Sequence, residues 1–508
     1  MTRVAVATTS TLAADAARQI SAAGGNAVDC AVGAALMSMN TEPGVCALAG
    51  GAYVTVWAPG QDPVTIDGNH AAPGRGLAEE QRGQGAVSVT MDYGSGVSTL
   101  VGVGSVAVPG ALAALDKAWS NHGNVAWKEL FTPTIAAVKR GFPLSSSCSY
   151  YLHYSGDRIF GRSVDGYNAL HYEDKRLREP GSAIAIPHLA DSLQAIADDG
   201  ADVFYKGELG RAISDHVRAG DGALTMQDLE NCRAVQRPAL ISRVGDWQIA
   251  TNPPPAVGGS VLTAMLLACA ELPGTHWNKA TLAQLIHSQH ACLDFRRDHL
   301  DLADDVGSEA ARLIDAAKNG RIMTNWSSAS TVHTSAVDEN GLGCAITASA
   351  GYGSGEMPEG TGLWLNNGLG EIELNRRGLV AGEPGTPLPS NMAPSVARSE
   401  SEVIAIGSPG ADRITTALHQ VIVNLVEMNM TLADAIGHPR VHVDTSGEFD
   451  RLCVEPGLDL PDTDLPIVQF DRLNMYFGGV GAALYDDDTG FEVASDPRRD
   501  GATSISDD

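Results

Sequence analysis

The sequence predicts one composite α/β unit with an opening pair of helices, a helical middle and a β-rich final third. The chain has 508 residues, of which 44% are hydrophobic and 19% are charged, so it can bury a large core and is not a disordered chain. Helical and β periodicity both occur, in separate stretches. No internal repeat or low-complexity tract divides the chain into smaller units.

The N-terminal part predicts two helices followed by a hairpin. Apolar residues recur at helical spacing from Leu12 to Ile20, and Gly24-Gly25-Asn26 supplies a C-cap. The next run, residues 27–39, is apolar nearly all round and predicts a buried helix. Two β-rich runs, residues 53–57 and 64–66, flank a Pro-Gly turn and predict paired strands.

Residues 111–316 show mostly helical periodicity, interrupted at Gly141-Phe142-Pro143 and at Pro253-Pro254-Pro255. They predict a helical elaboration in the middle of the chain. Beyond residue 331 the pattern changes to short β-rich runs.

Two of these runs, residues 332–337 and 343–349, flank Asn340-Gly341, which predicts a type I′ hairpin. The tail from Asp486 onward is polar and acidic, and we expect it to be mobile.

Charge and cysteine usage restrict the partners and the compartment. Lys and Arg number 34 against 61 Asp and Glu, a net charge of −27, which repels phosphate backbones and anionic lipids. We therefore expect no nucleic-acid and no membrane partner. The eight cysteines form no C-x-x-C pair, as in reduced proteins, and the start of the chain lacks the features of a secretory signal. These observations predict a cytoplasmic protein.

Several common catalytic motifs are absent. No G-x-S-x-G elbow, Walker A loop or complete dinucleotide fingerprint occurs, which opposes a serine hydrolase of that type, an NTPase and a Rossmann oxidoreductase. We assign no cofactor. One set of side chains has the residue types and spacing of metal ligands: His287, His290, Asp294, Asp298 and His299. A solvated amphipathic helix explains this set more simply, so we assign no metal.

The most informative segment begins at Ser330-Thr331-Val332-His333. Taken alone, the run to Gly341 is a strand with polar residues on one face. Other segments of the chain match the same family in the same order: Gly24-Gly25-Asn26-Ala27-Val28-Asp29, Gly50-Gly51, Asp67 with Ala72-Pro73, Ser105 to Gly110, Pro253-Pro254-Pro255 with Gly258-Gly259, Leu365-Asn366-Asn367, and Gly407-Ser408-Pro409-Gly410. Together they resemble the gamma-glutamyltransferase (gamma-glutamyltranspeptidase) family, whose small subunit opens with a Thr-Thr-His-x-Ser-Val-Val-Asp run.

This resemblance implies an N-terminal nucleophile hydrolase with a four-layer αββα sandwich and a helical elaboration. It implies cleavage between Ser330 and Thr331, giving a large subunit of residues 1–330 and a small subunit of residues 331–508. We expect the two to remain one interlocked heterodimer. A free α-amine has a pKa of about 8. Once Thr331 is the first residue of a chain, its own amine can therefore take the proton from its hydroxyl during attack.

The resemblance also implies roles at matching positions. Ser349 matches the second hydroxyl residue, which contacts the amine of the nucleophile and supports processing. Gly410 and Ala411 match the pair whose backbone N–H groups form the oxyanion hole, with Ala411 where the family usually has a second glycine.

The substrate-binding positions depart from the family. Asn69 stands where the family has the arginine that binds the substrate α-carboxylate, and Gly368 stands where a Gln or Glu is usual. Ser390-Asn391 corresponds to a Ser-Ser pair, and Glu371 to the acid that holds the substrate ammonium group. Two residues that could replace the lost cation, His70 and Arg75, we expect at the surface.

We therefore expect a self-processing enzyme that forms an acyl intermediate on Thr331 and transfers it to water or an amine, with an altered small-molecule substrate. Two alternatives stay open. A relative in bacterial antibiotic pathways that make alkylproline units would use the same nucleophile to cleave a carbon–carbon bond next to a carbonyl. An uncleaved paralogue would only bind a ligand.

Overall fold

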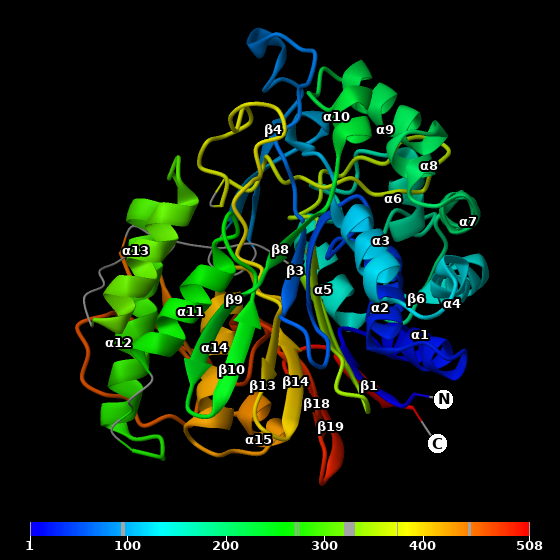
Figure 1. Ribbon diagram of the computed structural model, residues 1–508. Coiled ribbons are helices and arrows are strands. Elements are labelled where there is room, and N and C mark those ends of the chain that lie inside the picture. The colour runs from blue at the N-terminus through cyan, green and yellow to red at the C-terminus, as the bar shows by residue number, and fades with distance from the viewer. Residues whose placement is uncertain are drawn as a thin grey trace.

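Two β-sheets lie face to face between two layers of helices. The structure is a computed structural model, and it describes residues 2–92, 97–269, 272, 274–319, 331–372, 374–445 and 449–506. Figure 1 shows helices α1 to α4 on one side of the strands and α11, α12 and α14 on the other. The predicted four-layer αββα sandwich is confirmed.

The first sheet has seven strands among the described residues, and neighbouring strands are antiparallel throughout. Strands from before and after residue 331 are intermixed in it, so neither part of the chain forms this sheet alone. In spatial order the strands are β20 (Ala502–Ile505), β1 (Val4–Thr8), β11 (Val332–Asp338), β12 (Gly343–Ser349), β2 (Gly51–Trp57), β3 (Val64–Gly68) and β8 (Val235–Pro238).

The second sheet has six antiparallel strands among the described residues: β19 (Gly490–Ser495), β18 (Gly481–Asp486), β14 (Glu402–Gly407), β13 (Ser395–Arg398), β10 (Trp247–Thr251) and β9 (Leu240–Val244). The core between the sheets consists mainly of Ala and Val, such as Ala5, Ala345 and Ala405. These short side chains allow the two sheets to approach each other closely.

The helix α2 (Ala27–Thr41) is buried along its whole length, as its apolar sequence predicts. It packs on β11 and β12 with one face and on α1 (Thr11–Ala22) and α4 (Trp127–Arg140) with the others. Its start is fixed by a capping box in which Asn26 and Asp29 each accept a hydrogen bond from the other's backbone N–H, both at 3.0 Å. The Gly-Gly-Asn-Ala-Val-Asp segment is thus a helix start.

The remaining helices cover the edges and the second sheet. The helical elaboration comprises α3 (Ala111–His122), α5 (Ser146–Ser155), α6 (Val164–Leu170), α7 (Leu189–Asp199), α8 (Asp202–Tyr205), α9 (Glu208–Ala219) and α10 (Met226–Asn231). The second sheet is covered by α11 (Gly258–Ala268), α14 (Arg413–Val426) and α15 (Leu432–Gly437), with α12 (Lys279–Phe295) and α13 (Val306–Lys318) outside them.

Small strands complete the fold: β4 (Val87–Met91) with β5 (Val97–Val101), β6 (Phe142–Pro143) with β7 (Ala183–Ile184), and β15 (Val441–Asp444), β16 (Arg451–Val454) and β17 (Ile467–Gln469). None of the helices in the described ranges combines the length and the apolar character that crossing a bilayer requires.

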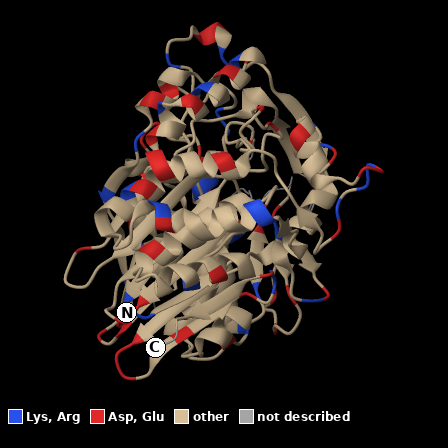
Figure 2. Cartoon of the chain, turned by 90° about the vertical axis from the view of Figure 1, so that its right-hand side faces the viewer, with Lys and Arg blue, Asp and Glu red and all other residues tan. Residues whose placement is uncertain are grey.

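Two expectations need correction. The helical middle also contains β8, β9 and β10, and these strands join both sheets. The tail is not a mobile extension, because β19 pairs with β18 and β20 pairs with β1. Figure 2 shows the two chain ends close together, as this pairing requires, with acidic residues spread over the visible helices and loops.

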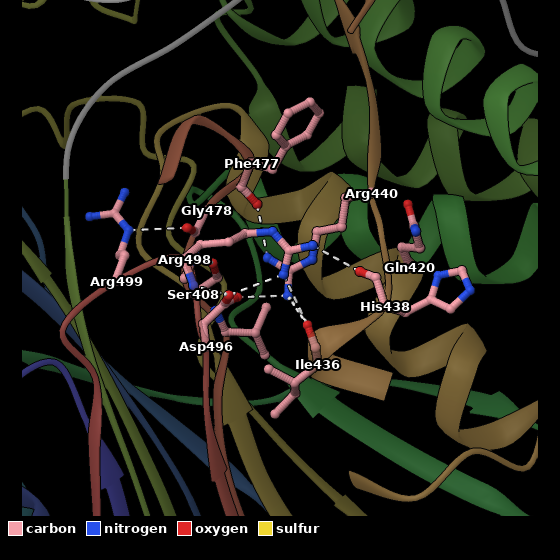
Figure 3. Close-up of polar contacts among 12 residues, drawn as sticks. Ser408, Gln420, Ile436, His438, Arg440, Phe477, Gly478, Asp496, Arg498 and Arg499 are labelled. Carbon is pink, nitrogen blue, oxygen red and sulfur yellow. Dashed lines mark hydrogen bonds and ion pairs between the residues drawn. The ribbon is translucent and has the colours of Figure 1, made fainter. Parts of the chain in front are cut away.

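The tail also supplies part of a buried ionic cluster. The Arg498 guanidinium is fully buried; it donates to a Glu455 carboxylate oxygen and lies 3.1 Å from Asp496, which is 2.7 Å from Arg440 (Figure 3). Burial opposes ionisation of Asp496, but the Arg440 and Arg498 charges hold its pKa below the usual value. This cluster fixes the tail to the body of the protein.

Replacing Arg498 by Met is expected to lower the free energy of unfolding by about 3–5 kcal/mol, because Glu455 and Asp496 lose a buried counter-charge. Thermal or denaturant unfolding measures this change. The matched control is Arg472→Met at an exposed position, which we expect to stay within about 0.5 kcal/mol of the parent. Equal effects of the two substitutions would contradict a role of the cluster.

Candidate active site

One small cavity gathers most of the residues that the sequence singled out. Its volume is about 20 Å³, enough for roughly one water molecule. The cavity is lined by Asn69, His70, Thr331, Ser349, Glu371, Leu374, Pro389, Ser390, Asn391, Met392, Ala411 and Ile414. Seven of the nine site residues proposed from the sequence therefore line the same cavity. Of the other two, Gly410 directly precedes Ala411, and Ser330 lies outside the described residues.

Thr331 and Ser349 are brought together by the register of the β11–β12 hairpin. Val332 pairs with Ala348, so the next position along each strand places Thr331 opposite Ser349. Thr331 is 3% exposed and Ser349 is 7% exposed. The Ser349 hydroxyl accepts a hydrogen bond from the Gly351 N–H at 3.0 Å. The predicted hairpin around Asn340-Gly341 is confirmed, and its register sets this pair. The turn is not of type I′, because Gly341 has a positive φ of 80° and Asn340 does not.

The turn after β14 carries Ala411, which lines the cavity, with Gly410 directly before it. Gly410 has φ 129° and Ala411 has φ 68°, a left-handed conformation that costs an alanine about 1 kcal/mol. Neither N–H donates a hydrogen bond within the described part of the chain. The helix α14 begins two residues later, and its N-terminal dipole also favours negative charge at this place. The turn can therefore stabilise a developing oxyanion.

The turn rests on surroundings that leave no room for extra side-chain atoms. A Cβ atom on Gly410 would lie 2.7 Å from the Gly478 Cα, and one on Gly407 would lie 2.1 Å from the His333 ring. The Gly479 N–H donates to Ser408 Oγ at 3.1 Å, and Arg440 holds the Phe477 carbonyl at 3.0 Å (Figure 3). The buried ionic cluster thus supports the turn from behind.

His333, two residues after Thr331, is a structural residue. Its ring nitrogens contact the Thr347 and Ser335 hydroxyl oxygens at 2.8 and 2.7 Å. Burial lowers its pKa to about 3, so the imidazole is neutral. With both nitrogens engaged, it is not available as a base for Thr331.

The loop that carries Glu371 is held by two buried asparagines. Asn366 Nδ2 donates to the carbonyls of Ala49 and Ala107 at 2.8 and 3.0 Å. Asn367 Oδ1 accepts from the Tyr352 N–H at 2.7 Å. These bonds explain the Leu-Asn-Asn motif, because they fix the start of the loop that carries Glu371. Glu371 is 4% exposed and lines the cavity.

Ser390 and Asn391 are placed by the Pro-rich segment and its two glycines. The Ser390 carbonyl accepts hydrogen bonds from the Val257 and Gly258 N–H groups at 3.0 and 2.9 Å. A Cβ on Gly258 would lie 2.2 Å from the Asn391 carbonyl oxygen. The first glycine of the Gly-Gly pair is therefore required for this close approach.

Comparison with known proteins agrees with this geometry. The gamma-glutamyltranspeptidase family profile matches residues 13–506. The chain belongs to the gamma-glutamyltranspeptidase family. It is 30% identical to a glutathione hydrolase proenzyme of Pseudomonas aeruginosa over 86% of this chain and 82% of that one.

Two further relatives are named as acylases. The chain is 29% identical to the acylase ACY 1 proenzyme of Pseudomonas sp. strain SE83 over 86% of this chain and 82% of that protein. The crystal structure of cephalosporin acylase from Bacillus halodurans superposes with a TM-score of 0.79 at 21% identity, covering 99% of this chain and 96% of that one. The second likeness concerns the fold.

At position 69, where the resemblance implies an arginine in the family, this chain has Asn69. Asn69 Nδ2 donates to the Leu388 carbonyl at 2.8 Å, which ties Asn69 to the segment before Ser390. His70 is buried and lines the cavity, so the expectation that it lies at the surface was wrong. Its ring occupies the space beside Gly368, where a Cβ would come within 3.0 Å of it. The glycine at a position where the family usually has Gln or Glu makes room for this imidazole.

His70 does not replace the lost cation. Burial lowers its pKa to about 4, and its Nε2 has no hydrogen-bond partner among the described residues. Arg75 is at the surface as expected: its side chain is 39% exposed, and Nε lies 3.9 Å from Asp228. The residues lining the cavity therefore include one acid, Glu371, and neither Lys nor Arg.

Sequence reasoning also missed Asp412, which lies behind the cavity. It accepts a hydrogen bond from Asn391 Nδ2 at 2.8 Å and lies 3.3 Å from Arg296. Burial raises its pKa to about 6, against the effect of Arg296. No motif pairs positions 296, 391 and 412, so only the fold reveals this link.

The two residues of the oxyanion turn are expected to respond oppositely to small substitutions. Gly410→Ala should lower the melting temperature, because φ 129° is outside the range of L side chains and the new Cβ would meet Gly478. Ala411→Gly should leave it unchanged or raise it, since it relieves about 1 kcal/mol of strain. Thermal unfolding compares the pair; a larger loss for Ala411→Gly would contradict the described turn.

Proposed function

We propose that the protein is a self-processing enzyme with an N-terminal threonine nucleophile. Cleavage between Ser330 and Thr331 would make Thr331 the first residue of the small subunit. The observation that carries this proposal is the common cavity of Thr331, Ser349 and the turn at Ala411. Family membership supports it, since relatives across most of the chain are named as proenzymes.

The two cleavage products would remain associated as a heterodimer. Strands of residues 1–330 and of residues 331–508 are intermixed in the first sheet, where β1 pairs with β11 and β20, and β2 pairs with β12. The second sheet likewise joins β10 to β13. Separating the chains would break these ladders and expose the core between the sheets.

Each group in the cavity has a definite role in the proposed reaction. The free α-amine of Thr331 takes the hydroxyl proton as Oγ1 attacks the substrate carbonyl carbon. The resulting oxyanion is stabilised by the N–H groups of Gly410 and Ala411, each worth roughly 3 kcal/mol in such sites. Ser349 orients the amine. The leaving group takes a proton, and water or an amine then removes the acyl group from Thr331.

The lining of the cavity supports a donor other than the gamma-glutamyl group. Glu371 retains a carboxyl group for a substrate ammonium group, while Asn69 and the neutral His70 supply no cation for an α-carboxylate. Ser390 and Asn391 offer neutral polar groups. We therefore propose an acyl donor that lacks the α-carboxylate. Amide cleavage is favoured by the names of the hydrolase and acylase relatives, and carbon–carbon cleavage stays a prediction of the sequence.

Self-cleavage is tested by intact-mass analysis and denaturing electrophoresis of the purified protein. We expect chains of residues 1–330 and 331–508 for the parent and for Thr331→Ser, and one uncut chain of 508 residues for Thr331→Ala. Thr334→Val is the matched control, because it removes a buried hydroxyl three residues further along the same strand. A folded, active parent with an unbroken chain would refute the proposal.

Donor specificity is tested with three anilides that differ only in charged groups: gamma-glutamyl, 4-aminobutyryl and butyryl. Removing the carboxylate should leave kcat/KM unchanged or higher. Removing the ammonium group as well should lower it about 10–100-fold, because a charge-assisted hydrogen bond to Glu371 is lost.

The isosteric variant Glu371→Gln is the control, and it should abolish the difference between the last two substrates. A preference of about 100-fold or more for the gamma-glutamyl anilide would contradict the proposed donor, because it would require a cation at the cavity.

A further inference from the structure

A second cluster of potential ligands lies at the end of α12, away from the cavity lining. His290 and Asp294 are one helical turn apart on this helix, and Asp450 directly precedes β16. His290 Nε2 lies 2.9 Å from an Asp450 carboxylate oxygen and 3.8 Å from an Asp294 oxygen. All three side chains offer a ligand atom within 4.8 Å of the others. The sequence placed the first two residues on one helix face, but it could not reveal Asp450.

Asp294 is the unusual member of this cluster. Its side chain is completely buried, and neither carboxylate oxygen has a hydrogen-bond partner among the described residues. A buried carboxylate normally has several partners, because removing it from water is costly. The other candidates on this stretch behave differently: His287 is exposed, and the Asp298 side chain is half exposed and accepts from Arg297 Nε at 2.9 Å.

The two arginines that follow Asp294 on the chain, Arg296 and Arg297, form ion pairs with other acids. Arg296 pairs with Asp301 at 2.9 Å and with Asp412 at 3.3 Å, and Arg297 pairs with Asp298. Neither makes an ion pair with Asp294 in the described part of the molecule. The groups nearest to Asp294 are therefore a histidine nitrogen and the Asp450 carboxylate, and the charges of Arg297 and Asp298 act on it from further away. A cation among the three ligand atoms would complete this arrangement.

We propose that His290, Asp294 and Asp450 bind a divalent cation of the zinc or manganese class. In a tetrahedral zinc site with bonds near 2.1 Å, ligand atoms are about 3.4 Å apart, and the two distances from His290 Nε2 lie on either side of this value. A mixed imidazole and carboxylate set favours these metals over calcium, which takes six to eight oxygen ligands. A water molecule would fill the fourth position.

A cation at this site would link two elements of the fold. It would strengthen the link between the end of α12 and the pair of strands β15 and β16, which the contact of His290 with Asp450 already joins. The helix continues directly into Arg296, whose guanidinium reaches Asp412 beside the oxyanion turn. A cation at Asp294 would therefore fix the segment from which Arg296 extends.

The test is direct metal binding by the full-length protein after treatment with a chelator. Titration with ZnCl2 followed by calorimetry should show one equivalent bound, and Co²⁺ should give the visible absorption bands of a four-coordinate site. Asp294→Asn and His290→Gln should each weaken binding by about 100-fold or more, since even groups that only support ligands are worth 10–100-fold. The melting temperature should rise with Zn²⁺ in the parent and not in these variants.

His287→Gln and Asp298→Asn are the matched controls, because they change a histidine and an aspartate of the same stretch outside the cluster. Both should bind Zn²⁺ as the parent does. Absence of stoichiometric binding in the parent would overturn the proposal, and so would binding that neither Asp294→Asn nor His290→Gln weakens. If one of these two variants does not fold, the other, with the Co²⁺ spectrum, decides.

Discussion

The position of β11 between two partner strands is the constraint on which the site depends. The strand is hydrogen-bonded to β1 on one side and to β12 on the other, and all its residues are buried. Thr331 directly precedes it, so the proposed nucleophile is anchored next to two ladders. The same pairing sets Ser349 opposite Thr331, and β14 packs across β11 and leads into the turn at Gly410 and Ala411. One strand thus fixes the relative positions of Thr331, Ser349 and this turn.

The differences from the family at the substrate end are physically coupled. A side chain at position 368 would compete for the space that the His70 ring fills, since even a Cβ at Gly368 would come within 3.0 Å of it. Glycine at this position therefore leaves room for a neutral imidazole in a closed environment, where burial lowers its pKa to about 4. The lining of the cavity thus includes Glu371 and neither Lys nor Arg. Together with the net charge of −27, this lining is the basis of the proposed donor without an α-carboxylate.

Local sequence signals predicted the elements whose causes are local. The apolar run of α2 and the Asn-Gly turn between β11 and β12 each act within a few residues, and the buried helix and the hairpin are both confirmed. The turn type was wrong, because a type I′ turn needs a positive φ at both central residues and Asn340 has none. The tail was predicted wrongly, because β20 is held by pairing with β1 at the other end of the chain, which its polar sequence does not show. The motif order placed Thr331, Ser349 and Ala411 in one site. It could not place His70 or Asp412, whose roles depend on contacts across the fold.

The negative charge of Asp412 lies next to the turn at Gly410 and Ala411, and the fold compensates it with a buried arginine. Asp412 follows Ala411 directly, and an uncompensated carboxylate there would oppose the negative charge that the turn is arranged to stabilise. Arg296, fully buried and 3.3 Å away, supplies the opposite charge, and Asn391 donates to the same carboxylate oxygen at 2.8 Å. The Arg296 charge is shared with Asp301, however, so burial still raises the pKa of Asp412 to about 6. Because the guanidinium reaches both acids from the end of α12, the conformation of this helix end affects the balance of charge beside the turn.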